Sequence, residues 1–206
     1  MLFRSAAAFA ILVLVGPEHA RWNYCWLFTI SCWFALDVYW AFAARRAKPA
    51  AEGRQTLLTL LCTLLIYAVY CLPLSFIPIL GQRVVPHFAG LEMFGAFMCV
   101  SGIGFAIWAR HTLGKSWQAD VTPKKDHAFV RHGPYAIVRH PIYLGLLVAV
   151  VGMVLVLGEV RTLVFLLGVY ILLKKIGQEE NVLRSTFPCD FSEYEQRVKR
   201  LIPWVW

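Results

Sequence analysis

Residues 56–80 decide the fold class, and they read TLLTLLCTLLIYAVYCLPLSFIPIL. No charged side chain interrupts this run from Thr56 to Leu80. An uncharged apolar stretch of about 20 residues is long enough to cross the hydrocarbon core of a bilayer as a helix. The sequence therefore predicts a transmembrane α-helix here.

Five further apolar segments lie along the chain: Leu2–Gly16, Cys25–Ala43, Leu91–Ala109, Ile142–Leu157 and Thr162–Leu173. Of the 206 residues, 59% are hydrophobic and 16% are charged, whereas a soluble domain has about 45–50% apolar and about 25% charged residues. The first segment and the last two are short, and Gly158-Glu159 separates the last two as in a helical hairpin. We therefore predict an all-α, polytopic transmembrane helix bundle of five or six spans.

Lysine and arginine are concentrated in alternate connections between these segments. The rich regions are 45–54, 110–139 and 174–200, whereas the poor connections hold only Arg21, Arg83 and Arg161. Loops rich in basic residues stay on the cytoplasmic side of a membrane. The net charge of +8 is therefore interpreted as topology and not as binding to nucleic acid. We predict an integral, multi-pass membrane protein in contact with the lipid bilayer, with both termini cytoplasmic.

The whole chain, 1–206, is expected to form a single membrane domain with two halves of different character. Residues 1–90 are interpreted as lipid-facing helices with aromatic residues at their ends, as at membrane interfaces. Residues 91–206 carry the specific polar residues, and Gly95 and Gly102 predict close packing of the fourth span inside the bundle. Five of the six cysteines lie in apolar segments without metal-ligand spacing, so neither disulfides nor a metal site is predicted.

Residues 130–145 are the most informative polar stretch, and they read VRHGPYAIVRHPIYLG. They close a long connection that begins at Arg110 and is interpreted as a functional cytoplasmic loop. Gly133-Pro134 predicts a turn, and Pro141 suits the first turn of the following helix. Arg139 and His140 then lie at a helix N-terminus, which favours an anionic ligand. His140 as a simple helix cap is the structural alternative.

Two further elements follow the last apolar segment. Lys175 and Glu179 are four residues apart, so they share one face of a helix. Glu179 and Glu180 have a structural alternative, in which they form a solvated face that balances Lys174 and Lys175. Residues 187–203, with Phe191 and Tyr194, predict an amphipathic C-terminal helix that covers the site.

From about Leu91 to the C-terminus the chain resembles the isoprenylcysteine carboxyl methyltransferase family of membrane enzymes. The likeness rests on an ordered set of motifs: Leu113-Gly114-Lys115-Ser116-Trp117, Gly133-Pro134-Tyr135, Arg139-His140-Pro141-Ile142-Tyr143-Leu144-Gly145, Glu179-Glu180, Phe187, Tyr194 and Ile202-Pro203. The His-Pro-x-Tyr core alone is unspecific, because phospholipid N-methyltransferases share it. The glutamate pair and the Ile-Pro ending make the complete set specific.

The resemblance implies an S-adenosylmethionine-dependent methyltransferase that releases S-adenosylhomocysteine from a cytosol-facing pocket under the tail. The acceptor would be a lipophilic or prenylcysteine-type carboxylate, on an amphiphilic small molecule or a lipidated protein C-terminus. By motif, the family's cofactor-binding positions fall on Thr122, His127, Ala128, Phe129, Val130, Tyr135, His140, Pro141, Ile142, Tyr143 and Glu179. Lys175 and Glu179 are the catalytic residues that the resemblance implies.

Lys175 departs from the family pattern, which has an arginine that orients the substrate at this position. Lysine neutralises a carboxylate but lacks the bidentate fork of arginine. This departure leaves phospholipid N-methylation open as an alternative, in which an amine acceptor needs a base such as Glu179, Glu180 or His140. A non-enzymatic membrane scaffold or transporter subunit is the second alternative.

Overall fold

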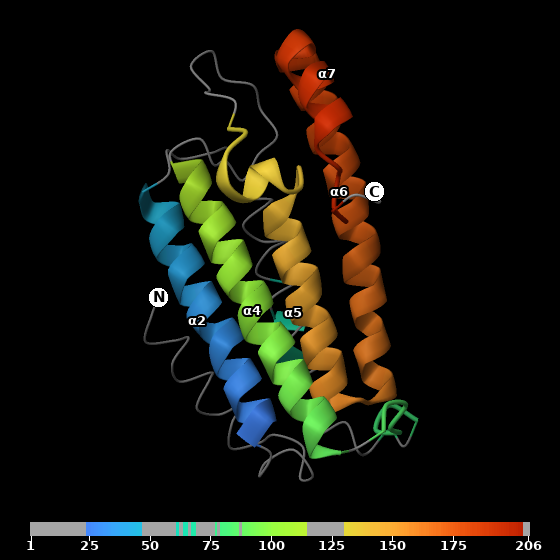
Figure 1. Ribbon diagram of the computed structural model, residues 1–206. Helices are drawn as coiled ribbons and strands as arrows, with labels where there is room; N and C mark the ends of the chain where they lie inside the picture. Colours follow the sequence, from blue (N-terminus) through green and yellow to red (C-terminus); the bar gives the residue numbers. More distant parts are fainter. Residues whose placement is uncertain are drawn as a thin grey trace.

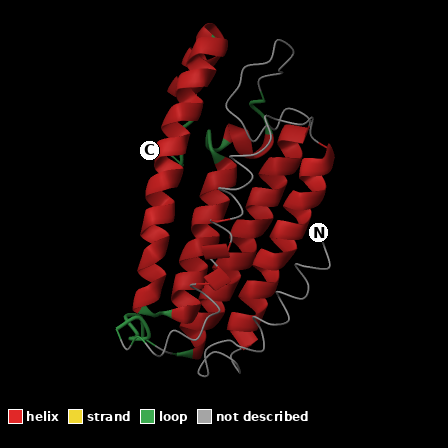
Figure 2. Cartoon of the chain, turned by 180° about the vertical axis from the view of Figure 1, so that it is seen from behind, coloured by secondary structure: helices red, strands yellow, loops and turns green. Residues whose placement is uncertain are grey.

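The computed structural model describes residues 24–46, 61, 64–65, 67–68, 77, 79–86, 88–114 and 130–203. Its elements are α2 (Tyr24–Arg46), α4 (Ala89–Leu113), η3 (Gly133–Ala136), α5 (Pro141–Leu157), η4 (Val160–Leu163), α6 (Val164–Thr186) and α7 (Pro188–Arg197). Four long helices, α2, α4, α5 and α6, lie side by side with similar axes (Figure 1, Figure 2). Apart from two isolated β-bridges, these described ranges hold no strand, which confirms the all-α prediction for them.

Three of the predicted apolar segments coincide with helices. Segments 25–43 and 91–109 lie in α2 and α4, which are long and apolar enough to cross a membrane, and segment 142–157 lies in the shorter apolar helix α5. The segment 162–173 forms only the first half of α6, which continues to Thr186. Segment 2–16 and most of 56–80 lie outside the described residues, so the number of spans stays a prediction.

Small residues bring α4 and α5 into backbone contact. A Cβ atom on Gly102 would lie 2.5 Å from the carbonyl oxygen of Gly145, and one on Gly95 would lie 2.7 Å from that of Gly152. The glycines are seven residues apart on each helix, so they repeat along one face every two turns. The close packing expected from Gly95 and Gly102 is confirmed. It fixes the N-terminus of α5 beside the C-terminus of α4.

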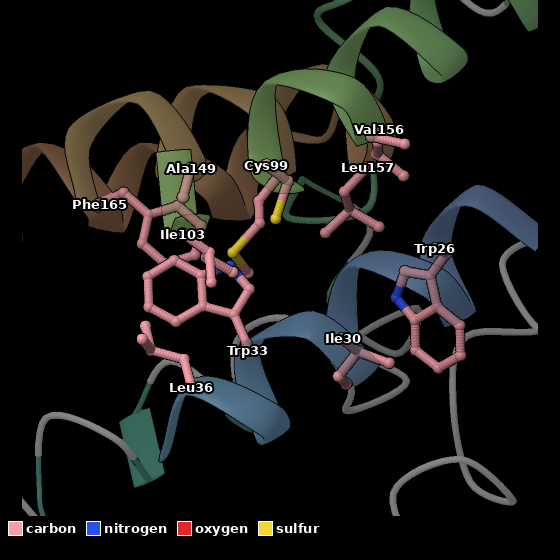
Figure 3. Packing of buried hydrophobic residues seen from close by; sticks show 12 residues of the cluster. Trp26, Ile30, Trp33, Leu36, Cys99, Ile103, Ala149, Val156, Leu157 and Phe165 are labelled. Atoms are coloured by element: carbon pink, nitrogen blue, oxygen red, sulfur yellow. The ribbon is translucent and has the colours of Figure 1, made fainter. Parts of the chain in front are cut away.

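The core lies between α2 and the α4–α5 pair (Figure 3). From α2, Trp26, Ile30 and Trp33 project at positions i, i+4 and i+7 onto one helix face, and each is at most 9% exposed. Their partners in the core cluster include Cys99, Ile103, Ala149, Met153, Val156, Leu157 and Phe165. Outward-facing side chains are apolar as well, for example Phe97 on α4 and Leu166 on α6, each 65% exposed. Such faces suit contact with lipid.

The α5–α6 connection, which we call the hairpin end, confirms the helical hairpin predicted from Gly158-Glu159. Gly158 has a φ of 67°, and its carbonyl accepts a hydrogen bond from the N–H of Val84 at 2.8 Å. This bond holds segment 79–86 against the turn. Arg161 Nε lies 2.6 Å from Glu159 Oε2, and both side chains are almost fully buried. A buried ion pair between residues close in sequence therefore stabilises the hairpin end.

Candidate active site

The N-terminal end of α5, which we call the site end, follows the turn predicted at Gly133-Pro134. Gly133 has a φ of 62°, a conformation that glycine adopts without steric cost, and η3 follows with Tyr135 buried. His140 is the N-cap of α5, and Pro141 occupies its first turn as predicted. Residues 138–140, which we call the His140 turn, thus start the helix at the upper end of the bundle in Figure 1.

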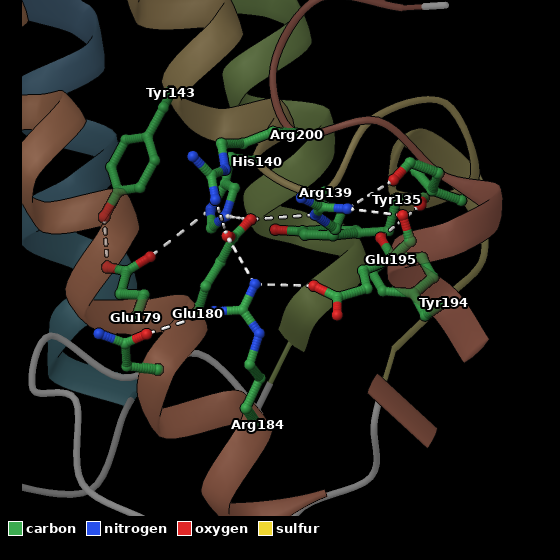
Figure 4. A network of polar contacts seen from close by, with 12 residues as sticks. Tyr135, Arg139, His140, Tyr143, Glu179, Glu180, Arg184, Tyr194, Glu195 and Arg200 are labelled. Carbon is green, nitrogen blue, oxygen red and sulfur yellow. Dashed lines mark hydrogen bonds and ion pairs between the residues drawn. The ribbon is translucent and has the colours of Figure 1, made fainter. Parts of the chain in front are cut away.

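The helix α6 brings both glutamates to the His140 turn (Figure 4). Tyr143 donates its hydroxyl hydrogen bond to Glu179 Oε1 at 2.5 Å, and His140 Nδ1 lies 3.7 Å from Glu179 Oε2. On its other side, the His140 ring lies with Nε2 3.3 Å from Glu180 Oε1. Two motifs separated by about forty residues of sequence therefore converge on one histidine ring.

The C-terminal tail also reaches this place. The backbone N–H of Arg139 donates to the carbonyl of Lys199 at 2.8 Å, and that of His140 donates to the carbonyl of Arg200 at 3.1 Å. Val138 and Lys199 form a parallel bridge. The tail therefore pairs through its backbone with all three residues of the His140 turn.

The amphipathic helix predicted over 187–203 is confirmed for its first part, α7 (Pro188–Arg197). Residues 198–203 are not helical, because Lys199 and Arg200 pair through their backbone with the His140 turn instead. Its two buried residues are Phe191 and Tyr194. The Tyr194 hydroxyl donates to the carbonyl oxygen of Tyr135 at 2.6 Å. Burial raises the pKa of both Tyr135 and Tyr194 above their ordinary value, so both phenols are neutral at physiological pH. As expected, the tail packs against the site.

Glu180 has a fully buried side chain between cations. Arg139 Nε lies 3.0 Å from Glu180 Oε1, and Arg200 donates to Glu180 Oε2 at 2.5 Å. Burial by itself raises the pKa of this carboxyl, but hydrogen bonds from His140 and Arg200 and the charge of Arg139 outweigh it and lower the pKa to about 2. Glu180 is therefore ionised. The anion that the N-terminus of α5 was expected to attract is supplied here by the chain itself.

Glu179, one residue earlier, has a different environment. Its side chain is 26% exposed, and it lies beside the Tyr143 hydroxyl and the His140 ring. The rings of His140 and Tyr143 stack with centroids 5.8 Å apart and an interplanar angle of 21°. A partly open carboxylate beside a stacked aromatic pair can accept hydrogen bonds from a ligand and lie against a cationic group.

Other predicted site residues are distributed as follows. Val130 and Ile142 are half-buried and Pro141 is buried, all near the His140 turn along the chain. Lys175 is half-buried on α6, one turn before Glu179. Four predicted cofactor-binding residues lie outside the described residues: Thr122, His127, Ala128 and Phe129. Their contacts with the cofactor stay predictions.

Sequence reasoning missed the central position of Glu180 and its partners Arg139 and Arg200. The sequence places Glu180 in the glutamate pair of the motif set, with a solvated residue or a base for an amine as its possible roles, but does not predict its ion pairs. A signal existed for Arg139, because it lies in the same motif as His140. None existed for Arg200, since its pairing depends on the return of the tail across the site.

The arrangement defines a class of protein: an apolar helical bundle with a polar site at one end, where a His-Pro turn, a glutamate-bearing helix and the tail meet. The same fold occurs in the solved structure titled "Structure of the eukaryotic intramembrane Ras methyltransferase ICMT (isoprenylcysteine carboxyl methyltransferase) without a monobody". The TM-score is 0.62 at 18% identity, over 98% of this chain and 75% of that one. The chain therefore shares the fold of that protein.

The sequence of the site-bearing half matches a family model. Residues 95–185 match the sequence model of the isoprenylcysteine carboxyl methyltransferase (ICMT) family. This region includes α4, the His140 turn, α5 and both glutamates of α6.

Two relatives illustrate the extent of the similarity. The protein-S-isoprenylcysteine O-methyltransferase of Schizosaccharomyces pombe is 36% identical over 96 residues, which are 45% of this chain and 41% of that protein. The Saccharomyces cerevisiae protein of the same name is 32% identical over 117 residues, 54% of this chain and 48% of that protein. The chain thus spans less than half the length of these relatives.

Proposed function

We propose that this protein transfers the methyl group of S-adenosylmethionine to a prenylcysteine-type carboxylate at one face of a membrane. The family match of residues 95–185 supports this reaction. The observation that carries the proposal is the convergence of His140 and Tyr143 with Glu179, which joins the two motifs expected to bind one cofactor (Figure 4).

The residues present at the site end suit this cofactor. Glu179 is a partly exposed carboxylate that can accept hydrogen bonds from ribose hydroxyls or pair with an ammonium group. The stacked faces of His140 and Tyr143 suit a neighbouring sulfonium. The motif also assigns Tyr135, which is buried in η3, and residues 122 and 127–130 to the cofactor.

Methylation of a carboxylate requires the protein mainly to position the acceptor and the cofactor. S-adenosylmethionine, when bound, supplies a methyl group on a positive sulfur. A carboxylate acceptor is already ionised at neutral pH, so its oxygen forms the new O–C bond while the C–S bond breaks, and no proton has to move. Lys175 is the cation that orients the carboxylate in this proposal, and the tail excludes water from the site.

The carboxylate acceptor is favoured over the amine of phospholipid N-methylation. An amine must lose a proton, which requires a free base near the acceptor. Glu180 is fully buried and pairs with Arg139 and Arg200, so its lone pairs are occupied. Glu179 already accepts from Tyr143. The engagement of both glutamates thus favours an acceptor that needs no base.

We further propose a single integral membrane domain, 1–206, of five or six spans with both termini cytoplasmic. The site end carries arginines 131, 139, 184 and 200, whereas the hairpin end carries the buried pair Glu159–Arg161. This asymmetry supports a cytoplasmic site end. A lipidated acceptor would then reach the site from the adjoining bilayer.

Incubation of the purified protein with tritiated S-adenosylmethionine and a prenylated cysteine analogue tests the reaction. We expect base-labile, volatile label, because a methyl ester releases methanol in alkali. Base-stable label on an amine acceptor would support phospholipid N-methylation instead. If the wild type does not bind S-adenosylhomocysteine, and its melting temperature with this ligand is the same as that of His140→Ala, only the scaffold alternative remains.

Two variants, Lys175→Arg and Lys175→Ala, test the role of position 175, where this chain departs from the arginine of the family pattern. If Lys175 orients a carboxylate, we expect Lys175→Ala to lower kcat/KM for the prenylcysteine analogue by about tenfold or more, the loss of one charged contact. Lys175→Arg should retain or increase activity. Equal activity of all three proteins would remove Lys175 from the mechanism.

A further inference from the structure

Glu180 joins three parts of the chain that lie far apart in sequence. Its Oε1 faces Arg139 Nε at 3.0 Å and His140 Nε2 at 3.3 Å, both from the His140 turn. Its Oε2 accepts from Arg200 of the tail at 2.5 Å. The side chain itself is 0% exposed. One buried carboxylate of α6 thus compensates the charge of two arginines on two other segments.

Arg139 extends this connection to the end of α7. Its Nη1 donates to the carbonyl oxygens of Glu195 and Val198, both at 2.9 Å. Its backbone N–H donates to the carbonyl of Lys199. The Arg139 guanidinium therefore forms its hydrogen bonds with groups of the protein itself. Among the described residues, its only carboxylate partner is Glu180.

Glu179 and Glu180 have separate tasks because consecutive helical residues project about 100° apart. Glu179 faces Tyr143 and the Nδ1 side of His140 and is partly exposed. Glu180 faces the Nε2 side of the same ring and is closed to solvent. His140 is held between them, so the orientation of the ring depends on both carboxylates (Figure 4).

We propose that Glu180 is a positioning residue, which sets the orientation of His140 and holds the C-terminal tail over the cofactor site. This inference deepens the proposed function and rests on it for the affinity measurement. The effect on the tail depends only on the contacts above. Glu180 acts through His140, Arg139 and Arg200 and does not itself contact the cofactor.

Glu180→Gln, which keeps the size but removes the charge, tests the proposal in the full-length protein in detergent. The first measurement is amide hydrogen exchange at Arg139 and His140, whose N–H groups bond to the tail. We expect exchange to be faster by about tenfold or more, the equivalent of one lost charge-assisted hydrogen bond. The N–H of Val84, which bonds to Gly158 at the hairpin end, should exchange as in the wild type.

The second measurement is the dissociation constant for S-adenosylhomocysteine, taken well below the melting temperature. We expect Glu180→Gln to weaken binding by about tenfold through loss of the ordered His140 ring, and Glu180→Asp to restore part of it. Glu193→Gln serves as the matched control, because Glu193 is exposed and pairs only with Arg131 and Arg197 in the described residues. It should change neither measurement.

The outcomes separate this inference from the proposed function. Faster exchange at Arg139 and Val84 alike would show a general loss of stability and would overturn a positioning role. Unchanged exchange at Arg139 and His140 would overturn it as well. If the wild type binds no S-adenosylhomocysteine, the proposed function fails, while the exchange data still decide whether Glu180 holds the tail.

Discussion

Two buried carboxylates lie at opposite ends of the same helical hairpin, and their partners differ. At the hairpin end, Glu159 pairs with Arg161, two residues away in sequence. At the site end, Glu180 pairs with Arg139 and Arg200, which are 41 and 20 residues away. The first pair closes a turn, whereas the second joins the His140 turn, α6 and the tail. A local pair stabilises one connection, but a long-range pair can control the shape of a site.

The largest effect on stability is expected at the hairpin end, where a substitution should lower stability but leave activity almost unchanged. Glu159→Ala leaves Arg161 buried without its carboxylate, so we expect a loss of about 3–5 kcal/mol of stability. The activity of the folded fraction, measured as kcat/KM, should stay within about twofold of the wild type, because the turn is at the far end of α5. Thermal melting in detergent and methyl-transfer assays check the two parts. A specific loss of kcat/KM without a lower melting temperature would contradict this division of roles.

At the site end, Glu179→Gln is expected to have the opposite profile. Loss of the carboxylate that accepts from Tyr143 and would bind the cofactor should lower kcat/KM by roughly 100-fold, equivalent to one or two charged hydrogen bonds. The melting temperature should change little, because Glu179 is partly exposed. Parallel titration with S-adenosylhomocysteine should show the same loss. Wild-type affinity in this variant would exclude Glu179 from the cofactor site.

The α4–α5 contact connects the two ends, and a matched pair of glycines tests it. Gly102→Ala places a Cβ 2.5 Å from the Gly145 carbonyl, so we expect a loss of about 1–3 kcal/mol from overpacking. Gly104→Ala, on the same helix with no atom within 4 Å of its Cβ, should be neutral or stabilise by up to about 1 kcal/mol. Thermal melts of the two variants decide the matter, and equal melting temperatures would show that the helices can separate without cost.

The smallest effect concerns pH and Glu180 alone. Since its folded-state pKa is lowered to about 2 from 4.5, its contribution to stability is fully present above about pH 4.5 and is lost as the pH falls through about 2. The difference in melting temperature between the wild type and Glu180→Gln should follow the same curve. A difference that disappears already between pH 7 and 5 would contradict the charge pairing described here.

The helices and the close packing of α4 follow from local sequence. The apolar runs predict α2, α4 and α5 within a few residues, because burial in an apolar environment depends mainly on side-chain hydrophobicity. The small residues Gly95 and Gly102 predict the tight contact of α4, since only residues without a bulky side chain permit backbone contact. The Gly-Pro turn and Pro141 predict the start of α5. The sequence also indicated His140, Tyr143 and Glu179 through the family resemblance, and the structure brings these three side chains together.

The sequence by itself thus determined an apolar helical protein, the bounds of its main helices and the identity of the motifs that form the site. Tertiary structure alone decided that Glu180 is buried while Glu179 stays partly open, and that Arg200 returns to pair with α6. The physical reason is that hydrophobic periodicity and turn residues act over a few positions, whereas ion pairing depends on distance in space. Segments 138–140, 179–180 and 198–200 carry no local signal of their contact, because it exists only after the helices have packed.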